Sequence, residues 1–298
     1  ENASRGHKMI RQPAVAGQFY PGTRTACLAE IEECLPAGPI GGDLPNPIVA
    51  GIVPHAGWTF SGDLAASVFA AIRQVNGPVD TFVLFGAAHR SYGGPAAVFD
   101  KGGWQTPLGL VSIDEDLAAQ LAAFEGALAD PLAHRAEHSI EVQLPFIQHL
   151  FPNVKIVPIL VPPEDFNPDF GDAVGRLLAA QNVKKTVCIG STDLTHYGPR
   201  YGFCPEGVGP DALNWAFQVN DMEFIRQALQ MDCRQIVPVA LEKQNACGPA
   251  AAAAAIAAAR AMGASGGVLI GHTSSNDIMQ KKFGQRSEES VGYAGIVF

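Results

Sequence analysis

Residues 81–89 read Thr-Phe-Val-Leu-Phe-Gly-Ala-Ala-His, and this stretch decides how the chain is expected to fold. The apolar residues from Phe82 to Phe85 form an unbroken run, which is typical of a strand that is covered on both faces of a sheet. The run ends in three small residues and then in His89. We therefore predict a buried strand over residues 81–86 that delivers a histidine at its carboxyl end.

The same order of strand and histidine occurs twice more. Residues 52–58 read Ile-Val-Pro-His-Ala-Gly-Trp and contain His55, and residues 187–196 read Val-Cys-Ile-Gly-Ser-Thr-Asp-Leu-Thr-His and end at His196. Binding sites in open α/β sheets form at the carboxyl ends of strands, so we expect His55, His89 and His196 to share one site. A neutral imidazole can ligate a metal or act as an acid or base. The alternative for each histidine alone is a hydrogen-bonded loop residue.

Similar apolar runs alternate with helical patterns along the chain. The pattern over residues 60–72, for example, repeats an apolar residue at every fourth position. This alternation predicts an α/β fold in one domain over residues 9–298, with a central, mostly buried sheet flanked by helices. We interpret residues 1–8 as a remnant of a cloning sequence. The predicted strands are residues 48–54, 81–86, 155–161, 186–190, 267–271 and 291–298, and further helical patterns cover 140–151, 213–228 and 249–262.

Composition narrows the classes of function. The 298 residues carry 20 Lys and Arg against 29 Asp and Glu, a formal net charge of −9, and an acidic surface argues against nucleic acid or an anionic membrane as the main partner. The longest apolar run, residues 250–259, is well short of the ~20 residues that a membrane-spanning helix needs. The six cysteines form no Cys-x-x-Cys pair, so we expect a reduced, cytoplasmic protein.

A cysteine at the start of a predicted helix is another candidate. Residues 245–249 read Asn-Ala-Cys-Gly-Pro, and Pro249 suits the first position of the alanine-rich helix that follows. A helix N-terminus is expected to lower the pKa of the Cys247 thiol and to favour the thiolate, which binds metal or attacks carbon. The alternative is that Cys247 is a small buried apolar residue.

A polar cluster precedes another helical pattern. Residues 137–141 read Glu-His-Ser-Ile-Glu, and the spacing of His138 and Glu141 can place both side chains on one face of a helix. We expect these two residues to bind substrate or to support the ligands. The alternative is a solvated charge pair behind a helix that is capped by Ser139.

Three further residues are candidates because of where they stand in the sequence. Asp193 comes three residues before His196 and can orient that histidine, act as a weak ligand or cap the following turn. Trp58 and Asn245 lie next to the candidate histidine and cysteine, and we expect them to contribute to substrate binding or support. The remaining histidines with no such context, His134, His149 and His272, are interpreted as structural.

Together these motifs resemble a known family. The chain is similar to the Memo family, whose prokaryotic members are called AmmeMemoRadiSam system protein B, over nearly all of residues 11–298. The resemblance rests on the segments Ala-Gly-Gln-Phe-Tyr-Pro at 16–21, Pro-His-Ala-Gly-Trp at 54–58, Gly-Ala-Ala-His at 86–89, Glu-His-Ser-Ile-Glu at 137–141, Ser-Thr-Asp-Leu-Thr-His-Tyr-Gly at 191–198, Asn-Ala-Cys-Gly at 245–248 and Ser-Val-Gly-Tyr-Ala at 290–294.

The resemblance implies a fold similar to that of the class III extradiol dioxygenases, which hold non-haem Fe(II) with two histidines and a carboxylate. Carried onto this sequence, it makes His55 and His89 the imidazole ligands and places Cys247 where the carboxylate ligand would stand. It also makes His196 the acid/base residue, with Asp193 beside it. Because a thiolate favours softer ions than a carboxylate does, the departure at Cys247 puts ring cleavage in doubt more than metal binding.

Three functions follow from this interpretation. The first is a metal-dependent oxidoreductase of the extradiol dioxygenase type that acts on a small phenolic substrate, with iron as the expected metal and copper or zinc as alternatives. The second is a metal-binding or redox protein without turnover that works with a radical-SAM partner, as the family's name suggests. The third is a hydrolase with Cys247 as nucleophile and His196 as base.

Overall fold

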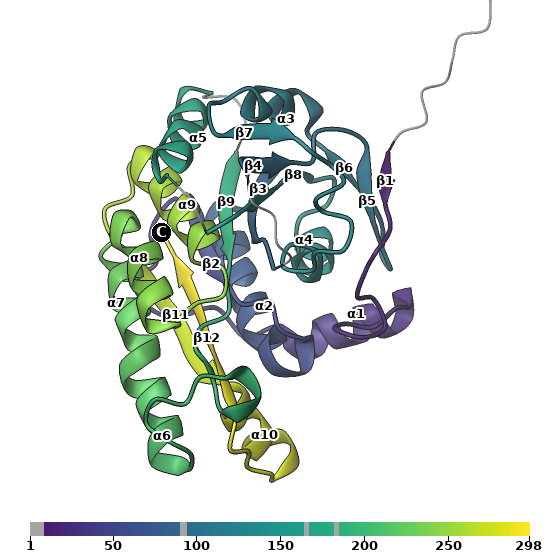
Figure 1. The fold of residues 1–298 in the computed structure, drawn as a ribbon. Helices are drawn as coiled ribbons and strands as arrows, with labels where there is room; N and C mark the ends of the chain where they lie inside the picture. Colours follow the sequence, from purple (N-terminus) through teal and green to yellow (C-terminus); the bar gives the residue numbers. More distant parts are fainter. Residues whose placement is uncertain (1–8, 90–93, 164–166, 182–184) are drawn as a thin grey trace, which may run out of the picture.

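A central sheet runs through the molecule, and helices cover it on both faces (Figure 1). The computed structural model describes residues 9–89, 94–163, 167–181 and 185–298, so the predicted remnant at residues 1–8 lies outside the described residues. The expected α/β fold with a buried central sheet is confirmed.

The middle of the sheet is parallel. All residues of β2 and β3 are buried, as unbroken apolar runs require in a sheet that is covered on both faces. The carboxyl ends of these parallel strands therefore meet at one end of the sheet. In spatial order the strands are β6 (Gly109–Ile113), β8 (Lys155–Val161), β3 (Thr81–Ala87), β9 (Thr186–Ser191) and β2 (Ala50–Val53), and each neighbouring pair is parallel.

Antiparallel and short strands extend the sheet on both sides. Next to β2 lies β12 (Ser290–Val297), which pairs antiparallel with β2, β10 (His196–Tyr197) and β11 (Val268–Ser274). Beyond β6 lie β5 (Gly103–Thr106) and β1 (Ile10–Arg11), while β4 (Ala96–Val98) and β7 (Ala127–Ala129) branch from β8.

Two helices face opposite sides of the sheet at positions where glycines leave room for them. A Cβ atom on Gly51 of β2 would lie 3.1 Å from Val68 of α2 (Trp58–Asn76), and one on Gly190 of β9 would lie 2.7 Å from the carbonyl oxygen of Ala251 in α9 (Pro249–Ala261). Among the described residues, no helix has both the length and the apolar character that crossing a bilayer requires. The other α-helices are α1 (Arg24–Cys34), α3 (Glu115–Ala122), α4 (Leu144–Leu150), α5 (Asp169–Ala180), α6 (Pro210–Trp215), α7 (Asp221–Leu229), α8 (Cys233–Lys243) and α10 (Ser275–Phe283).

The alanine-rich helix α9 is buried because its small side chains allow close packing. Residues 250–259 are all buried, and α9 lies between the sheet and helix α5 (Figure 1). A Cβ atom on Gly171 of α5 would lie 2.5 Å from the carbonyl oxygen of Ala254. The prediction that the alanine run serves close packing against the sheet is confirmed.

Two helical patterns are interrupted in the structure. The pattern over 140–151 begins as the 3₁₀ helix η1 (Glu141–Gln143) and becomes α-helical only at Leu144, whose amide donates to the Glu141 carbonyl oxygen. This geometry follows from Pro145, which has no N–H group to offer that carbonyl. The pattern over 213–228 contains the π-helical turn Ala216–Asn220 between α6 and α7, which accounts for its shift in register.

Candidate metal centre

The parallel strands bring distant histidines together. Val53 at the end of β2 pairs with Ser191 at the end of β9, and β3, which leads to His89, lies on the other side of β9. His55 and His89 therefore emerge at the same end of the sheet. Their imidazole rings are perpendicular, with centroids 4.9 Å apart.

The segment before α9 places Cys247 beside these histidines. The Cys247 amide donates to the Asp193 carbonyl oxygen at 3.2 Å, and the Gly248 amide donates to the Thr192 hydroxyl at 2.9 Å. A Cβ atom on Gly248 would lie 2.5 Å from the carbonyl oxygen of Ser191. The close approach of this segment to the end of β9 therefore requires a glycine at position 248.

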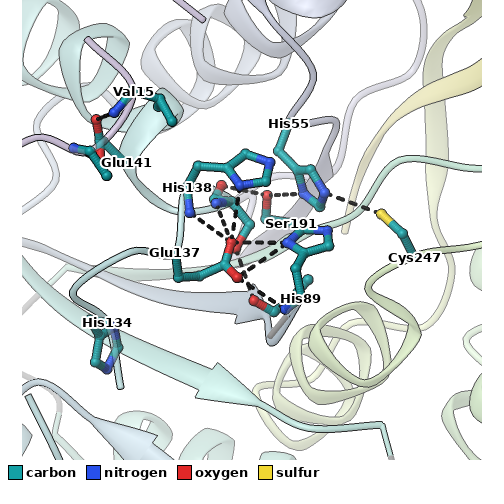
Figure 2. Close-up of polar contacts among 12 residues, drawn as sticks. Val15, His55, His89, His134, Glu137, His138, Glu141, Ser191 and Cys247 are labelled. Carbon is teal, nitrogen blue, oxygen red and sulfur yellow. Dashed lines mark hydrogen bonds and ion pairs between the residues drawn. The ribbon is translucent and has the colours of Figure 1, made fainter. Parts of the chain in front are cut away.

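The three side chains form one cluster of ligand atoms. The Sγ atom of Cys247 lies 3.1 Å from Nε2 of His55, and the ligand atoms of His55, His89 and Cys247 all lie within 4.8 Å of one another. Figure 2 shows His55 and His89 directed towards the same space as the Cys247 sulfur. Two nitrogens and one sulfur at these separations form a suitable set for a transition-metal ion.

Hydrogen bonds to Nδ1 fix the orientation of both histidines. The Ser191 hydroxyl donates to the Ser139 carbonyl oxygen at 2.8 Å, so its oxygen accepts from Nδ1 of His55 at 3.0 Å. Nδ1 of His89 donates to the Glu137 carboxylate at 3.0 Å. The Nδ1 atom of each histidine is thus engaged by a partner, and Nε2 is the ring nitrogen directed towards the shared space, as in many metal-binding histidines.

The Glu137 carboxylate binds both His89 and His138. Its carboxylate accepts hydrogen bonds from the backbone amides of His89, His138 and Ser139 as well as from the His89 ring. Glu137, His89 and His138 could themselves hold a metal ion by distance. We assign Glu137 to orienting His89 because its oxygens are already occupied by these donors.

The pKa values of the cluster reflect burial and mutual contact. Burial lowers the pKa of His55, and the neighbouring His89 and His138 lower it further. Burial also lowers the pKa of His89, but the Cys247 sulfur and the Glu137 carboxylate outweigh it and raise that pKa to about 10. Burial raises the pKa of the Cys247 thiol. The expected lowering of this pKa is therefore not found in the metal-free protein, because desolvation of the sulfur outweighs the hydrogen bond with His89.

His196 and Asp193 line the same region without joining the ligand set. Nδ1 of His196 donates to the Leu194 carbonyl oxygen at 3.1 Å, which leaves Nε2 as an acceptor. Burial lowers the pKa of His196, and the charge on His89 lowers it further. The Asp193 carboxylate accepts from the His55 amide at 2.6 Å, and burial raises its pKa to about 7.

His138 also faces the cluster. Its ring stacks on His89 with centroids 4.8 Å apart and lies 5.5 Å from the His55 ring. Phe19 contacts its other side edge-on at 4.8 Å. His138 therefore lies beside the candidate ligands, and its part in substrate binding or support stays a prediction.

Glu141, by contrast, is turned away from the cluster and holds the N-terminal segment (Figure 2). Its carboxylate pairs with Arg11 at 2.8 Å and accepts hydrogen bonds from the amides of Ala14 and Val15 and from the Tyr20 hydroxyl. Glu141 is fully buried. The alternative interpretation, a solvated charge pair, is therefore wrong. The expected helical face does not exist, because the α-helix starts only at Leu144.

Trp58 and Asn245 occupy the surroundings of the centre. Trp58 is buried between Tyr20 and Phe146, and its Nε1–H donates to the Val142 carbonyl oxygen at 2.9 Å. Asn245 is buried, and its side chain donates to the Asn220 carbonyl oxygen at 3.0 Å. Both contacts support the segments that carry ligands, and neither side chain joins the ligand set.

The three histidines interpreted as structural lie in other parts of the molecule. Nε2 of His134 donates to the Ala97 carbonyl oxygen at 2.9 Å, and this ring packs on Phe99 and Trp104. His149 pairs with Glu32 at the surface, and His272 pairs with the buried carboxylate of Asp221.

Sequence reasoning missed two residues that orient the ligands. Ser191 and Glu137 enter the sequence analysis only as members of their motifs, although each binds Nδ1 of a candidate ligand. The signal for Glu137 was its place next to His138. Spacing alone could not show which of Glu137 and Glu141 faces the cluster.

Comparison with known proteins identifies the family of the chain. A family model described as "Memo-like protein" matches residues 11–297. The chain belongs to the Memo family. Proteins called "MEMO1 family protein" from Thermococcus onnurineus, Methanopyrus kandleri and Methanococcoides burtonii are 39%, 37% and 35% identical to it, and each alignment covers 97% of this chain and 99% of the relative. The Memo resemblance that was inferred from the sequence motifs is therefore confirmed.

Proposed function

We propose that this Memo-family protein binds one transition-metal ion through His55, His89 and Cys247 and uses it to oxidise a small phenolic substrate with O2. The observation that supports the proposal is the shared direction of the ligand atoms. Both histidines are oriented through Nδ1, and the Cys247 sulfur lies 3.1 Å from Nε2 of His55.

Iron is the metal we place first, with copper and zinc as alternatives. Two imidazoles and one thiolate leave coordination positions open, and an iron ion bound there would supply the chemistry that activates O2. The donor set fits such an ion because Nδ1 of each histidine is held by a hydrogen bond and Nε2 is the nitrogen that faces the shared space. The thiolate shifts the preference of the site towards softer ions.

His196 is the residue we assign to proton transfer. Nε2 remains an acceptor because Nδ1 donates to the Leu194 carbonyl oxygen, and burial lowers the pKa of the ring. His196 can therefore accept a proton from a substrate hydroxyl near neutral pH. Asp193 fixes the start of the His55 segment through the His55 amide, and His138 stacks on the ring of His89.

The test is metal analysis of protein purified without oxygen, followed by oxygen uptake with catechols. We expect one metal per chain in the wild type and its loss in Cys247→Ala, whereas Cys204→Ala, which changes an exposed cysteine, keeps the metal. We expect His196→Ala to keep the metal and to lower turnover by roughly 10²–10⁴-fold. Loss of metal in His196→Ala would contradict its assigned role.

Two other outcomes point to the alternatives. Stoichiometric metal without oxygen uptake would favour a metal or redox protein that works with a partner such as a radical-SAM enzyme. Absence of metal, together with rapid alkylation of Cys247 by iodoacetamide, would favour a hydrolase. For that chemistry we place the base at His55, because its Nε2 contacts the sulfur; the prediction from the sequence was His196.

A further inference from the structure

A π-helical turn contacts two segments that lead into the candidate centre. The turn Ala216–Asn220 joins α6 to α7 in one helical column beside β11 and β12 (Figure 1). Such turns are rare and often mark functional sites. This one ends at two buried polar residues, Asn220 and Asp221. The contacts of these two residues show what the turn holds in place.

Asn220 connects the segment that carries His196 with the segment that carries Cys247. Its side-chain amide donates to the Thr195 hydroxyl at 3.1 Å and to the Lys243 carbonyl oxygen at 3.0 Å. Its own carbonyl oxygen accepts from the Asn245 side chain at 3.0 Å. Thr195 immediately precedes His196, and Asn245 lies two residues before Cys247. One residue thus joins both segments.

Asp221 fixes the end of the turn. Its carboxylate accepts from the Thr195 amide and from Nε2 of His272, both at 3.0 Å. The His272 ring stacks on Phe217 of the same turn, with centroids 3.9 Å apart. A side chain on Gly292 of β12 would collide with the Asp221 carboxylate, so the strand packs directly on the carboxylate. These buried contacts anchor the end of the turn, where Asn220 lies.

We propose that Asn220 is a positioning residue that holds the Cys247 sulfur and the His196 imidazole at a fixed separation. The inference rests on the proposed function, because it assigns Cys247 to the metal and His196 to the substrate. Ligand and acid/base groups must be placed to within about 0.5 Å to function. Asparagine suits this position because its two N–H groups serve both segments at once, whereas an aspartate of the same shape would present only acceptors.

Cobalt(II) tests whether Asn220 positions the Cys247 sulfur, since a cobalt–thiolate bond gives a charge-transfer absorption band. We expect Asn220→Asp to weaken Co(II) binding by roughly 10–100-fold, the range typical of lost support around a metal site, and to reduce that band. Gln218→Ala, which changes an exposed residue of the same turn, is the matched control. It should bind Co(II) as the wild type does.

NMR of the imidazole groups in the zinc-loaded protein tests whether Asn220 also positions His196. Asn220→Asp should shift the His196 signals, and Gln218→Ala should not. Thr195→Val removes only the hydroxyl that Asn220 binds, so it should shift the His196 signals and leave the Co(II) affinity within about twofold, because the Lys243 contact remains. Thr195→Val also provides a readout if Asn220→Asp fails to fold.

Three results have distinct meanings. Wild-type protein that binds no Co(II) would overturn the proposed function itself. A wild type that binds Co(II), with an Asn220→Asp variant that shows the same affinity, the same band and unchanged His196 signals, would overturn only the positioning role. A variant with a lower melting temperature and an unchanged band and His196 spectrum would also overturn it, because Asn220 would then serve stability alone.

Discussion

Cys247 is the residue that distinguishes this site from a site of two histidines and a carboxylate. Its sulfur lies 3.1 Å from Nε2 of His55, so a substitution at this position changes the donor set directly. A carboxylate is a harder ligand than a thiolate. We expect Cys247→Asp to shift the preference of the site towards Fe(II) relative to Cu(I) by roughly tenfold or more.

Competition titrations of Fe(II) against Cu(I) measure this shift. Cys204→Asp, which changes an exposed cysteine, should leave the ratio of the two affinities as it is in the wild type. An unchanged ratio in Cys247→Asp would show that the sulfur does not bind the metal. Aspartate is the better choice for this test because glutamate is longer than the cysteine it would replace.

His134 makes stability depend on pH. Burial lowers the pKa of His134 to about 3, against the ordinary value of 6.5, and the nearby Arg11 lowers it as well. Between these two pH values the unfolded chain binds a proton that the folded protein excludes, so the contribution of His134 to stability is present above about pH 6.5 and is lost as the pH falls towards 3. The expected slope is about 1.4 kcal/mol per pH unit.

His134→Gln removes this titration and can keep the hydrogen bond to the Ala97 carbonyl oxygen. The free energy of unfolding, measured by denaturant titration at several pH values between 7 and 4, should therefore fall more steeply in the wild type than in the variant. Parallel curves for the two proteins would contradict the assignment of His134 as a neutral buried residue.

At the residue scale, the sequence predicted the residues of the cluster better than the residues that orient them. His55, His89 and Cys247 were recognisable because each follows a strand or starts a helix, and these positions converge in any parallel sheet of this type. The sequence could not show whether Glu137 or Glu141 faces the cluster. The answer depends on a short 3₁₀ helix, and the sequence periodicity does not reveal it.

The N-terminal segment before α1 packs on the core and binds the segment around Glu137. Arg11 donates to the carbonyl oxygens of His134 and Glu137 and pairs with Glu141, and its guanidinium lies over the Trp104 ring. The Glu141 carboxylate accepts four hydrogen bonds in a fully buried position. Removing one partner of such a buried pair leaves the other uncompensated.

We therefore expect Glu141→Gln to lower the free energy of unfolding by roughly 3–5 kcal/mol, because Arg11 loses its counter-charge in the core. The matched control is Glu32→Gln, since Glu32 is 65% exposed and pairs with His149 at the surface, where a pair contributes about 0–1 kcal/mol. Equal effects of the two substitutions in a denaturant titration would contradict this account of the N-terminal segment.

The longer apolar strands were predictable from their sequence pattern. The six predicted strands correspond to β2, β3, β8, β9, β11 and β12, and helix α9 was located from its proline and its alanines. The short strands β1, β4, β7 and β10 have only two or three residues each. Such strands exist because their neighbours in the sheet pair with them, so their own residues carry too little pattern to reveal them.

At the scale of the whole molecule, the order of the strands creates the site. His55 and Asp193 are joined by a hydrogen bond across 138 positions of sequence, and Cys247 contacts His55 across 192 positions. The parallel order β3–β9–β2 makes these contacts possible because it places three carboxyl ends side by side. The sequence indicated that the ends would meet, but the order of strands and the place of β12 depend on packing between distant segments.

The central claim is that His55, His89 and Cys247 bind one metal ion, and X-ray absorption spectroscopy of the zinc-loaded protein tests it most directly. The account predicts one sulfur neighbour at about 2.3 Å and nitrogen neighbours at about 2.0–2.1 Å from the zinc. The sulfur signal should disappear in Cys247→Ala and persist in Cys204→Ala. A spectrum with only nitrogen and oxygen neighbours, or a sulfur signal that survives Cys247→Ala, would contradict the claim.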